Sequence, residues 1–342
     1  MKVIFFCQNP YAFGILAPIM KVLKKKGYEY IWFIGPKIDK FPFDNELYTR
    51  EIKKLRDFKS DAIFVPGNEV PHYLRGVKTQ VFHGLAGEKK GHFRIRHYFD
   101  LYLTQGPFFT NKFNELKGKY NNFEVIETGW PKLDIFGENK DQYQNIKEDL
   151  LKKYKVKKIV LYAPTFSPSL TSAPYLTDEI KSLASEGDYL VICKFHDLMS
   201  NDLINTYKDI AEENDNIIYE TERNITKFLL ISDILISDTS SVVYEFLLLN
   251  KPVLTFKNNN ENIFWDDVKE YTNLKEGVES NLGKDSFKDQ RKYIMDNYHP
   301  YSDGKSAERM VEAVEDYIQK YGVPEKRKLS MYRKLKIKNI FG

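Results

Sequence analysis

Short runs of consecutive apolar residues alternate with segments of helical periodicity along most of the chain. Runs this short are typical of strands in a parallel sheet that is buried on both faces. They predict strands at residues 3–7, 30–34, 62–65, 80–82, 101–104, 125–127, 159–163, 189–194, 217–219, 234–237 and 253–256. Apolar residues recur every three or four positions between these runs, which predicts helices at residues 15–26, 201–213, 242–250 and 305–321.

The same alternation of strand and helix occurs twice, so we expect an α/β fold with two doubly wound, Rossmann-like domains facing a cleft. A polar, lysine-rich stretch at residues 141–157 predicts the linker between them. The expected division is an N-terminal domain at 1–140, a C-terminal domain at 158–322 and a tail at 323–342.

The composition is that of a globular protein, with 42% hydrophobic and 29% charged residues among 342. Cys7 and Cys193 both lie inside apolar runs, which predicts buried thiols in a reducing compartment. The first apolar run ends at Gln8, too early for a signal peptide, and no run reaches the ~18 residues of a membrane span. We therefore expect a cytoplasmic protein, or one that is peripheral to a membrane.

The net charge of +4 is too small to indicate nucleic acid binding. The end of the chain, however, mixes basic and apolar residues: its cations are Lys326, Arg327, Lys328, Arg333, Lys334, Lys336 and Lys338. A basic amphipathic tail of this kind is suited to an anionic membrane surface, and a solvated charged end is the alternative.

Ligands of open α/β sheets collect outside the carboxyl ends of the strands, so residues that follow strands are candidates for the site. The clearest is the turn between a strand and the helix at 242–250, where helix N–H groups and hydroxyls favour a phosphate. Simple capping of that helix is the alternative. The predicted donor-binding residues are Thr165, Lys194, Asp238, Thr239, Ser240, Ser241 and Glu245.

His83 and His196 each follow a predicted strand, one in each domain, and are the candidate catalytic residues. A single histidine at a strand end is more often structural, but these two would meet across the cleft. A glycine- and lysine-rich segment follows His83 and leads into a basic cluster that includes His92, Arg96 and His97. The expected contacts to an anionic acceptor are Gly84, Lys89, Lys90 and Arg94, and a solvated surface is the alternative.

Other chemistries lack their motifs. No Gly-x-Gly-x-x-Gly follows the first strand, and no P-loop or closely spaced Cys/His set occurs. The pair Asp266 and Asp267 is expected to be an incidental part of a loop. We therefore expect no cofactor and a site that works without a metal, with lysines and a helix dipole balancing a pyrophosphate.

Several motifs occur in an order that resembles a known family. They are His83-Gly84 with a later Lys-Lys pair, Thr128 to Asp134, Tyr162 to Phe166, Lys194 to His196, Ser232 to Ser241, Lys251 to Val253, and Asp303 to Lys305. Together, over about residues 78–310, they resemble the CDP-glycerol glycerophosphotransferases that build teichoic acids and related capsule polymers.

The resemblance implies a GT-B architecture and transfer of a polyol phosphate, glycerol phosphate above all, from a CDP-alcohol with release of CMP. It implies that His83 is the general base, that His196 contacts the donor phosphates, and that the turn from Asp238 to Ser241 lies at the donor pyrophosphate. Enzymes of this family act at the inner face of the membrane on glycan or lipid-linked acceptors. Two departures are a longer segment between His83 and Lys89, and Asp197 where proline often follows the second histidine.

Two other functions stay open at this point. One is a GT-B glycosyltransferase or sugar-nucleotide epimerase that uses a UDP- or CMP-sugar, because one fold serves many donors. The other is a non-catalytic nucleotide-binding subunit of a capsule-assembly complex. Within the first function, the sequence leaves glycerol phosphate and ribitol phosphate as alternatives.

Overall fold

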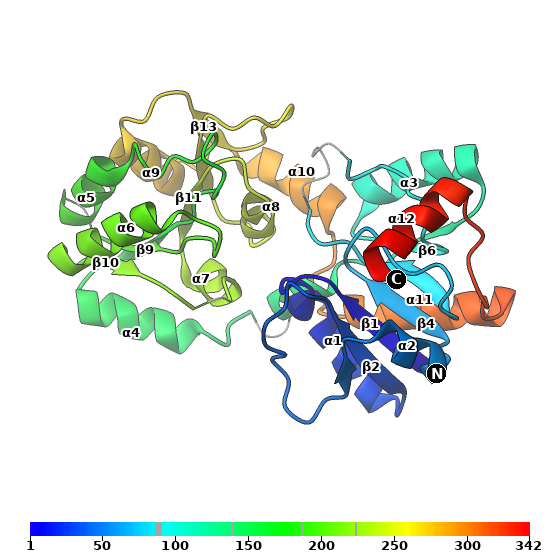
Figure 1. Ribbon diagram of the computed structural model, residues 1–342. Coiled ribbons are helices and arrows are strands. Elements are labelled where there is room, and N and C mark those ends of the chain that lie inside the picture. The colour runs from blue at the N-terminus through cyan, green and yellow to red at the C-terminus, as the bar shows by residue number, and fades with distance from the viewer. Residues whose placement is uncertain (86–90, 138–139, 187, 223) are drawn as a thin grey trace. The chain divides into compact units, whose positions relative to one another are not determined.

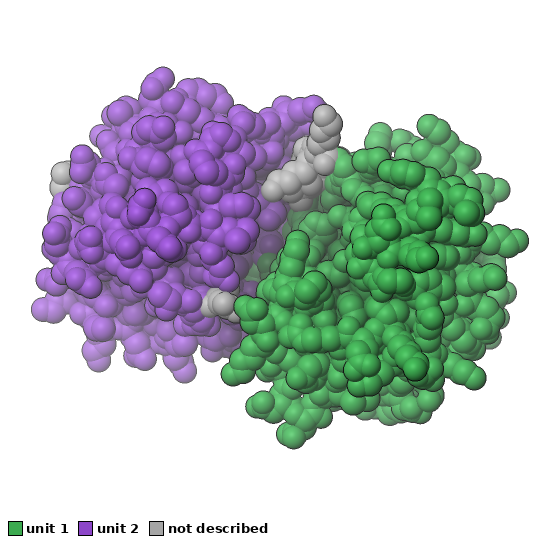
Figure 2. Space-filling view, viewed as in Figure 1, with its two compact units in different colours: residues 1–137, 297–342 green, residues 138–296 purple. Residues whose placement is uncertain are grey.

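The computed structural model describes residues 1–85, 91–137, 140–186, 188–222 and 224–342 (Figure 1). The chain forms two compact units, shown in different colours in Figure 2. Unit 1 combines residues 1–137 with 297–342, and unit 2 consists of residues 138–296.

Unit 1 is built on a parallel sheet with the strand order β3-β2-β1-β4-β5-β6-β7. Strand β1 is apolar and buried from Val3 to Cys7 because both of its faces are covered: Phe5 pairs with Trp32 on one side and Phe64 on the other, and all three are buried. Its elements are β1 (Lys2–Cys7), α1 (Ala12–Lys25), β2 (Glu29–Ile34), β3 (Tyr48–Thr49), α2 (Ile52–Phe58), β4 (Ala62–Val65), β5 (Val77–Gln80), β6 (Leu101–Thr104), α3 (Pro107–Tyr120), β7 (Glu124–Glu127), the 3-10 helix η1 (Pro131–Phe136), α11 (Ser306–Tyr321) and α12 (Met331–Phe341).

Unit 2 has a second parallel sheet, with the order β10-β9-β8-β11-β12-β13. Its elements are α4 (Gln144–Tyr154), β8 (Lys158–Tyr162), α5 (Thr177–Glu186), β9 (Tyr189–Cys193), α6 (Asn201–Glu213), β10 (Ile217–Tyr219), α7 (Thr226–Ile231), β11 (Ile234–Ser237), α8 (Val242–Leu247), β12 (Val253–Phe256), β13 (Asp266–Val268) and α9 (Leu274–Gly283). Helix α10 (Lys288–Tyr298) leads from unit 2 back into unit 1.

Each sheet has one point at which the strand order reverses direction, and ligands of doubly wound sheets bind at such points. In unit 1 it lies between β1 and β4, and in unit 2 between β8 and β11. The order of the strands therefore marks one candidate edge in each unit.

The predicted strands are confirmed with one clear error. Residues 80–82 were predicted as a strand, but β5 covers Val77–Gln80 and ends before His83. The prediction missed the start of β5 because this strand contains Lys78, which is fully buried, and a lysine is unexpected in a buried strand. Its ammonium group is accommodated by donating to the carbonyls of Leu74 and Gly76 at 2.5 and 3.0 Å. The short edge strands β3 and β13 were not predicted.

The predicted division of the chain is wrong at two places. Residues 141–157, predicted as a linker with a helical stretch, contain the helix α4 but belong to unit 2, where Lys147 lies 2.8 Å from the Asp233 carboxylate. The C-terminal domain does not extend to residue 322, because the chain from residue 297 onward, including α11, belongs to unit 1.

The motif from Thr128 to Asp134 explains why α11 belongs to unit 1. The carboxylate of Asp134 accepts hydrogen bonds from the first N–H groups of α11, those of Ser306 and Ala307, both at 2.9 Å. Gly129 has a φ of +83°, and a Cβ there would lie 2.4 Å from the Ser306 hydroxyl. These motif residues therefore tie distant parts of the chain together, which is a structural role.

His299 takes part in the same junction and was not singled out by the sequence. Its Nε2 accepts a hydrogen bond from the Trp130 N–H at 2.9 Å. Burial lowers the pKa of His299 to about 4, which keeps that nitrogen available as an acceptor at neutral pH. The two cysteines are buried in β1 and β9, as predicted.

Candidate functional site

His83 lies three residues beyond the end of β5, and its side chain is exposed. Its Nδ1 is 3.0 Å from the carbonyl oxygen of Pro66, which follows β4 at the reversal point of the unit 1 sheet. A carbonyl can only accept, so Nδ1 carries a proton, and whenever the ring is neutral its basic lone pair is on Nε2. This tautomer is the one required of a proton acceptor that works through Nε2.

Two glutamines hold the backbone around His83, and neither was predicted. The Gln80 amide donates to the carbonyls of Pro66 and Gly67 at 3.2 and 2.9 Å, and the Gln105 amide donates to Gly84 at 3.1 Å. Both glutamines are buried. Gln105 directly follows the mainly apolar strand β6, a signal that the sequence contained, whereas Gln80 ends β5, a strand that is itself mainly polar.

The remaining acceptor-side predictions have different outcomes. Lys89 and Lys90 lie outside the described residues. Arg94 is exposed and Gly84 is half-buried, so their contact with an acceptor stays a prediction. His92 does not contribute charge to the predicted basic cluster: its ring stacks on Phe82 with centroids 5.3 Å apart, and burial lowers its pKa to about 3.

In unit 2, the order β9-β8-β11 brings the predicted donor residues to one sheet edge. The Asp238 carboxylate at the end of β11 accepts hydrogen bonds from the Thr165 and Ser172 N–H groups at 3.0 and 3.1 Å. Phe166, next to Thr165, packs against the His196 ring with centroids 4.6 Å apart. A continuous chain of contacts therefore joins the ends of these three strands.

The hydrogen bond that His196 makes is the reverse of the one at His83. Its Nδ1 accepts the Leu198 N–H at 3.1 Å, so the proton of the neutral ring is on Nε2. Burial, opposed by Asp197 and assisted by Lys194, lowers the pKa of His196, so the ring is mainly neutral at pH 7. His196 thus presents an N–H donor, whereas His83 presents a base.

Lys194 precedes His196 by two residues and is 6% exposed. Its ammonium group donates to the Phe195 carbonyl at 2.7 Å. Burial lowers its pKa, with Asp197 opposing that shift. Lys194 directly follows β9, and its direct contact with a donor stays a prediction.

The turn after β11 differs in part from the prediction. Asp238 is 0% exposed and faces inward, so its carboxylate positions the loop after β8 instead of pointing outward to a donor. The Thr239 hydroxyl accepts the Asn259 N–H at 2.9 Å, and Ser240 accepts the Val242 N–H at a long 3.4 Å. Ser241 stands at the N-cap of α8 and makes no side-chain capping bond. Asp238 and Thr239 therefore do not cap α8, whereas Ser240 accepts from the N–H of its first residue, Val242.

Helix α8 is also shorter than predicted, because it ends at Leu247 and not at residue 250. Glu245 lies on it with 5% of its surface exposed. Donor contacts of Thr239, Ser240, Ser241, Thr165 and Glu245 stay predictions.

The loop after β12 supports this turn and was missed. Asn258 donates its side-chain amide to the Asp238 carbonyl at 3.0 Å, while its backbone N–H donates to Asp267 at 2.9 Å. Asp267 also accepts the Thr255 hydroxyl at 2.7 Å. Asp266 and Asp267 are therefore not incidental loop residues: they lie in β13, and Asp267 orders the neighbouring loop.

Asp238 makes a pH-dependent contribution to stability that can be isolated. Burial raises the pKa of its carboxyl from 3.8 to about 6, against the lowering effect of Ser172 and Thr165. The folded state therefore holds more protons than the unfolded state between pH 4 and 6, and stability falls as the pH rises through that range. Above pH 6, the ionised carboxylate of Asp238 should lower the free energy of unfolding by about 3 kcal/mol. For Asp238→Asn, which keeps an oxygen for the two N–H groups, we expect the stability relative to wild type to grow by that amount between pH 4 and 7.

Urea unfolding followed by circular dichroism across this pH range measures the difference. The exposed Asp289 on α10 provides the matched control, because its change to asparagine removes a carboxylate that is in solvent. A constant difference between wild type and Asp238→Asn over the whole range would contradict the assignment.

Within the described residues, no group of three or more His, Cys, Asp or Glu side chains is placed to hold a metal ion. Among these residues, too, no helix has both the length and the apolar composition to cross a bilayer. Independence from metals stays a prediction.

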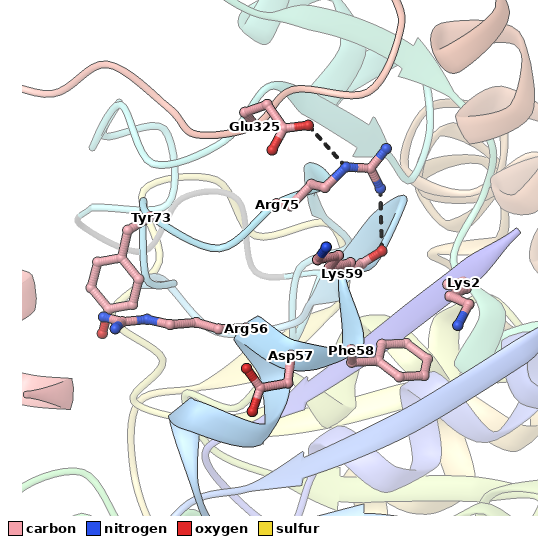
Figure 3. A pocket seen from close by; sticks show the side chains of 8 residues that line it. All are labelled: Lys2, Arg56, Asp57, Phe58, Lys59, Tyr73, Arg75 and Glu325. Carbon is pink, nitrogen blue, oxygen red and sulfur yellow. Dashed lines mark hydrogen bonds and ion pairs between the residues drawn. The ribbon is translucent and has the colours of Figure 1, made fainter.

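A cavity of about 710 Å³ lies at the amino-terminal ends of the unit 1 strands, where β1 and β5 begin, and so at the opposite end of the strands from His83 (Figure 3). Arg75 in its wall forms ion pairs with Asp61 at 2.8 Å and Glu325 at 3.1 Å. The residues that line it are Lys2, Arg56, Asp57, Phe58, Lys59, Tyr73, Arg75 and Glu325. None of the predicted site residues is among them.

Comparison with known proteins agrees with this arrangement. Residues 86–316, about two thirds of the chain, match the family model of CDP-glycerol:poly(glycerophosphate) glycerophosphotransferase. The chain is 27% identical over 271 residues to the teichoic acid ribitol-phosphate polymerase TarL of Staphylococcus aureus, covering 71% of this chain and 46% of TarL. It is 28% identical over 240 residues to the teichoic acid glycerol-phosphate primase of Bacillus subtilis, covering 64% and 58%. The chain thus spans about half the length of these relatives.

Among solved structures, the wall teichoic acid polymerase TagF superposes with a TM-score of 0.67 at 17% identity. The superposition covers 94% of this chain and 89% of that chain, which confirms the GT-B-type α/β fold. Because the family model matches most of the chain, this protein belongs to the CDP-glycerol:poly(glycerophosphate) glycerophosphotransferase family.

Proposed function

We propose that this chain transfers a polyol phosphate from a CDP-alcohol to a hydroxyl group of a glycan or lipid-linked acceptor, and releases CMP. Membership of the family supports the class of reaction. The observation that carries the chemistry is the opposite hydrogen bonding of the two histidines, with His83 a base at Nε2 and His196 a donor at Nε2. One proton acceptor and one charge-stabilising donor are what a phosphotransfer to a hydroxyl requires.

In the proposed step, Nε2 of His83 accepts the proton of the acceptor hydroxyl. The oxygen then forms a bond to the β-phosphorus of the CDP-alcohol, and the bond between that phosphorus and the bridging oxygen breaks. The electron pair and the negative charge leave with CMP. The role of the protein is to remove one proton and to stabilise the charge that develops on the phosphates.

His196 supports this step through its Nε2–H, which can donate to a phosphate oxygen without first being protonated. The buried charge of Lys194 adds an attraction for the pyrophosphate. Asp238 acts as a positioning residue, because it holds the loop that carries Thr165 and Phe166. On this proposal the hydroxyls of Ser240 and Ser241, both half-buried beside β11, contact the donor.

The acceptor and the location are further parts of the proposal. Relatives of the chain are named as ribitol-phosphate polymerases and glycerol-phosphate primases, so both polyol phosphates are candidates for the transferred group. We favour glycerol phosphate, delivered at the inner face of the cell membrane and without a metal ion.

A panel of nucleotide-activated compounds tests the donor. We expect CDP-glycerol or CDP-ribitol, with EDTA present, to raise the melting temperature on the order of 5–10 °C at about 100 times the dissociation constant. UDP- and CMP-sugars at the same concentration serve as controls and should leave it unchanged. A shift with a sugar nucleotide alone would contradict the proposal, as would donor binding that never yields CMP with a polyol-phosphate acceptor.

A further inference from the structure

The C-terminal segment is firmly attached to unit 1. Arg327 donates to the carbonyls of His97 and Asn122, both at 2.7 Å, and pairs with the carboxylate of Asp100. In α12, Ile337 is 0% exposed, and Phe341 packs edge-on against Phe6 with ring centroids 5.4 Å apart. The tail is therefore not a solvated end: one face of α12 is part of the hydrophobic core of unit 1.

The opposite face of α12 is also apolar, and it is exposed. Met331, Tyr332 and Leu335 are 70, 77 and 56% exposed. Tyr332 and Leu335 follow Met331 by one and four residues. All three side chains therefore lie on one side of the helix, away from Ile337. A helix that buries one apolar face normally shows a polar face to water, so this second apolar stripe is an unusual surface.

Lysines flank the stripe. Lys334 and Lys338 lie one turn apart along α12, and Lys326 and Lys328 precede the helix. All four are exposed, and none forms an ion pair with any residue that the structure describes. From residue 325 to the end of the chain, the only acidic residue is Glu325. The surface around the apolar stripe therefore carries uncompensated positive charge.

The positive surface continues past the end of the helix. The Tyr73 hydroxyl donates to the carbonyl of Gly342 at 3.1 Å, and the Arg56 guanidinium lies 4.3 Å from the centre of the Tyr73 ring. Figure 3 shows Tyr73 and Arg56 side by side in the cavity wall that also contains Lys59. Arg56 and Lys59 are both exposed, and Arg56 adds a cation beside the tyrosine that contacts the end of α12.

We infer that the outer face of α12 binds the surface of an anionic lipid bilayer. An apolar stripe with an aromatic residue, bordered by lysines on a helix too short to span, suits the boundary between headgroups and acyl chains. The unpaired lysines complement anionic headgroups, each strengthening binding about fivefold near the surface. None of the residues of this face belongs to the proposed site, so this inference extends the proposed function without depending on it.

Sedimentation of the full chain with vesicles tests the inference. The vesicles are phosphatidylcholine alone or equal parts of phosphatidylcholine and phosphatidylglycerol. We expect wild type to sediment with the anionic vesicles only, and less so as the salt concentration rises. Lys334→Gln with Lys338→Gln should weaken binding about 25-fold. Met331→Ser with Leu335→Ser should weaken it by at least roughly tenfold.

A matched control removes two exposed lysines of α4, by Lys152→Gln with Lys153→Gln, and should bind as wild type does. Equal vesicle binding by wild type and both α12 variants would overturn the inference. So would self-association of wild type, seen by sedimentation equilibrium and lost in Met331→Ser with Leu335→Ser, without any vesicle binding. Neither result involves turnover, so the proposed transfer reaction is tested independently.

Discussion

His83→Ala should lower the rate of transfer by about 10²–10⁴-fold while the affinity for CDP-glycerol stays at the wild-type value. The reason is the bond between Nδ1 and the Pro66 carbonyl, which places the basic lone pair on Nε2. Removing the ring removes the proton acceptor and leaves the donor residues of unit 2 untouched. CMP release under saturating donor, with donor affinity from calorimetry, measures the two effects separately.

Glutamine at position 83 sharpens this test. Its amide cannot accept a proton, so His83→Gln should be as inactive as His83→Ala. The control is His72→Asn, which changes a half-buried histidine that belongs neither to the proposed site nor to the predicted basic cluster. Wild-type turnover in either His83 variant would remove the general-base role.

His196→Ala should lower turnover by about 10²–10³-fold, the usual effect of losing one oriented donor to a developing negative charge. Unlike the change at His83, this one should also weaken donor binding, because the Nε2–H is expected to contact the donor phosphates before and during the reaction. The bond from the Leu198 N–H to Nδ1 is the structural basis for that expectation.

Glutamine distinguishes the two histidines. At position 196 its amide N–H can replace the donor, so His196→Gln should recover a substantial part of the activity that alanine loses. Recovery at position 196 and none at position 83 is the pattern expected of one donor and one base. If glutamine restored activity at position 83 and not at 196, the two roles would be exchanged.

The candidate site shows how far sequence patterns reach. The order of motifs correctly indicated the family, and the strand ends correctly indicated Thr165, His196 and Asp238 as neighbours at one edge. The role of Asp238 was not predictable in the same way. An aspartate before a helix start has the same local pattern whether it faces a ligand or the protein interior, and only the position of Thr165 and Ser172 decides.

The supporting residues were missed for a related reason. Gln80, Gln105, Asn258 and His299 act through backbone groups that lie 13 or more residues away in the sequence. A hydrogen bond to a main-chain carbonyl or N–H has no signature in the identity of the partner residue. Such contacts become visible only when the fold brings the segments together.

The sequence by itself determined the alternation of strands and helices, the parallel character of the sheets and the positions of the chemically reactive side chains. These follow from local periodicity and burial, which depend on near neighbours in the chain. Tertiary structure decided that α11 joins unit 1, which tautomer each catalytic candidate holds, and which face of α12 is exposed. Each depends on a hydrogen bond or a packing contact that the fold creates, so no local pattern of residues could have specified it.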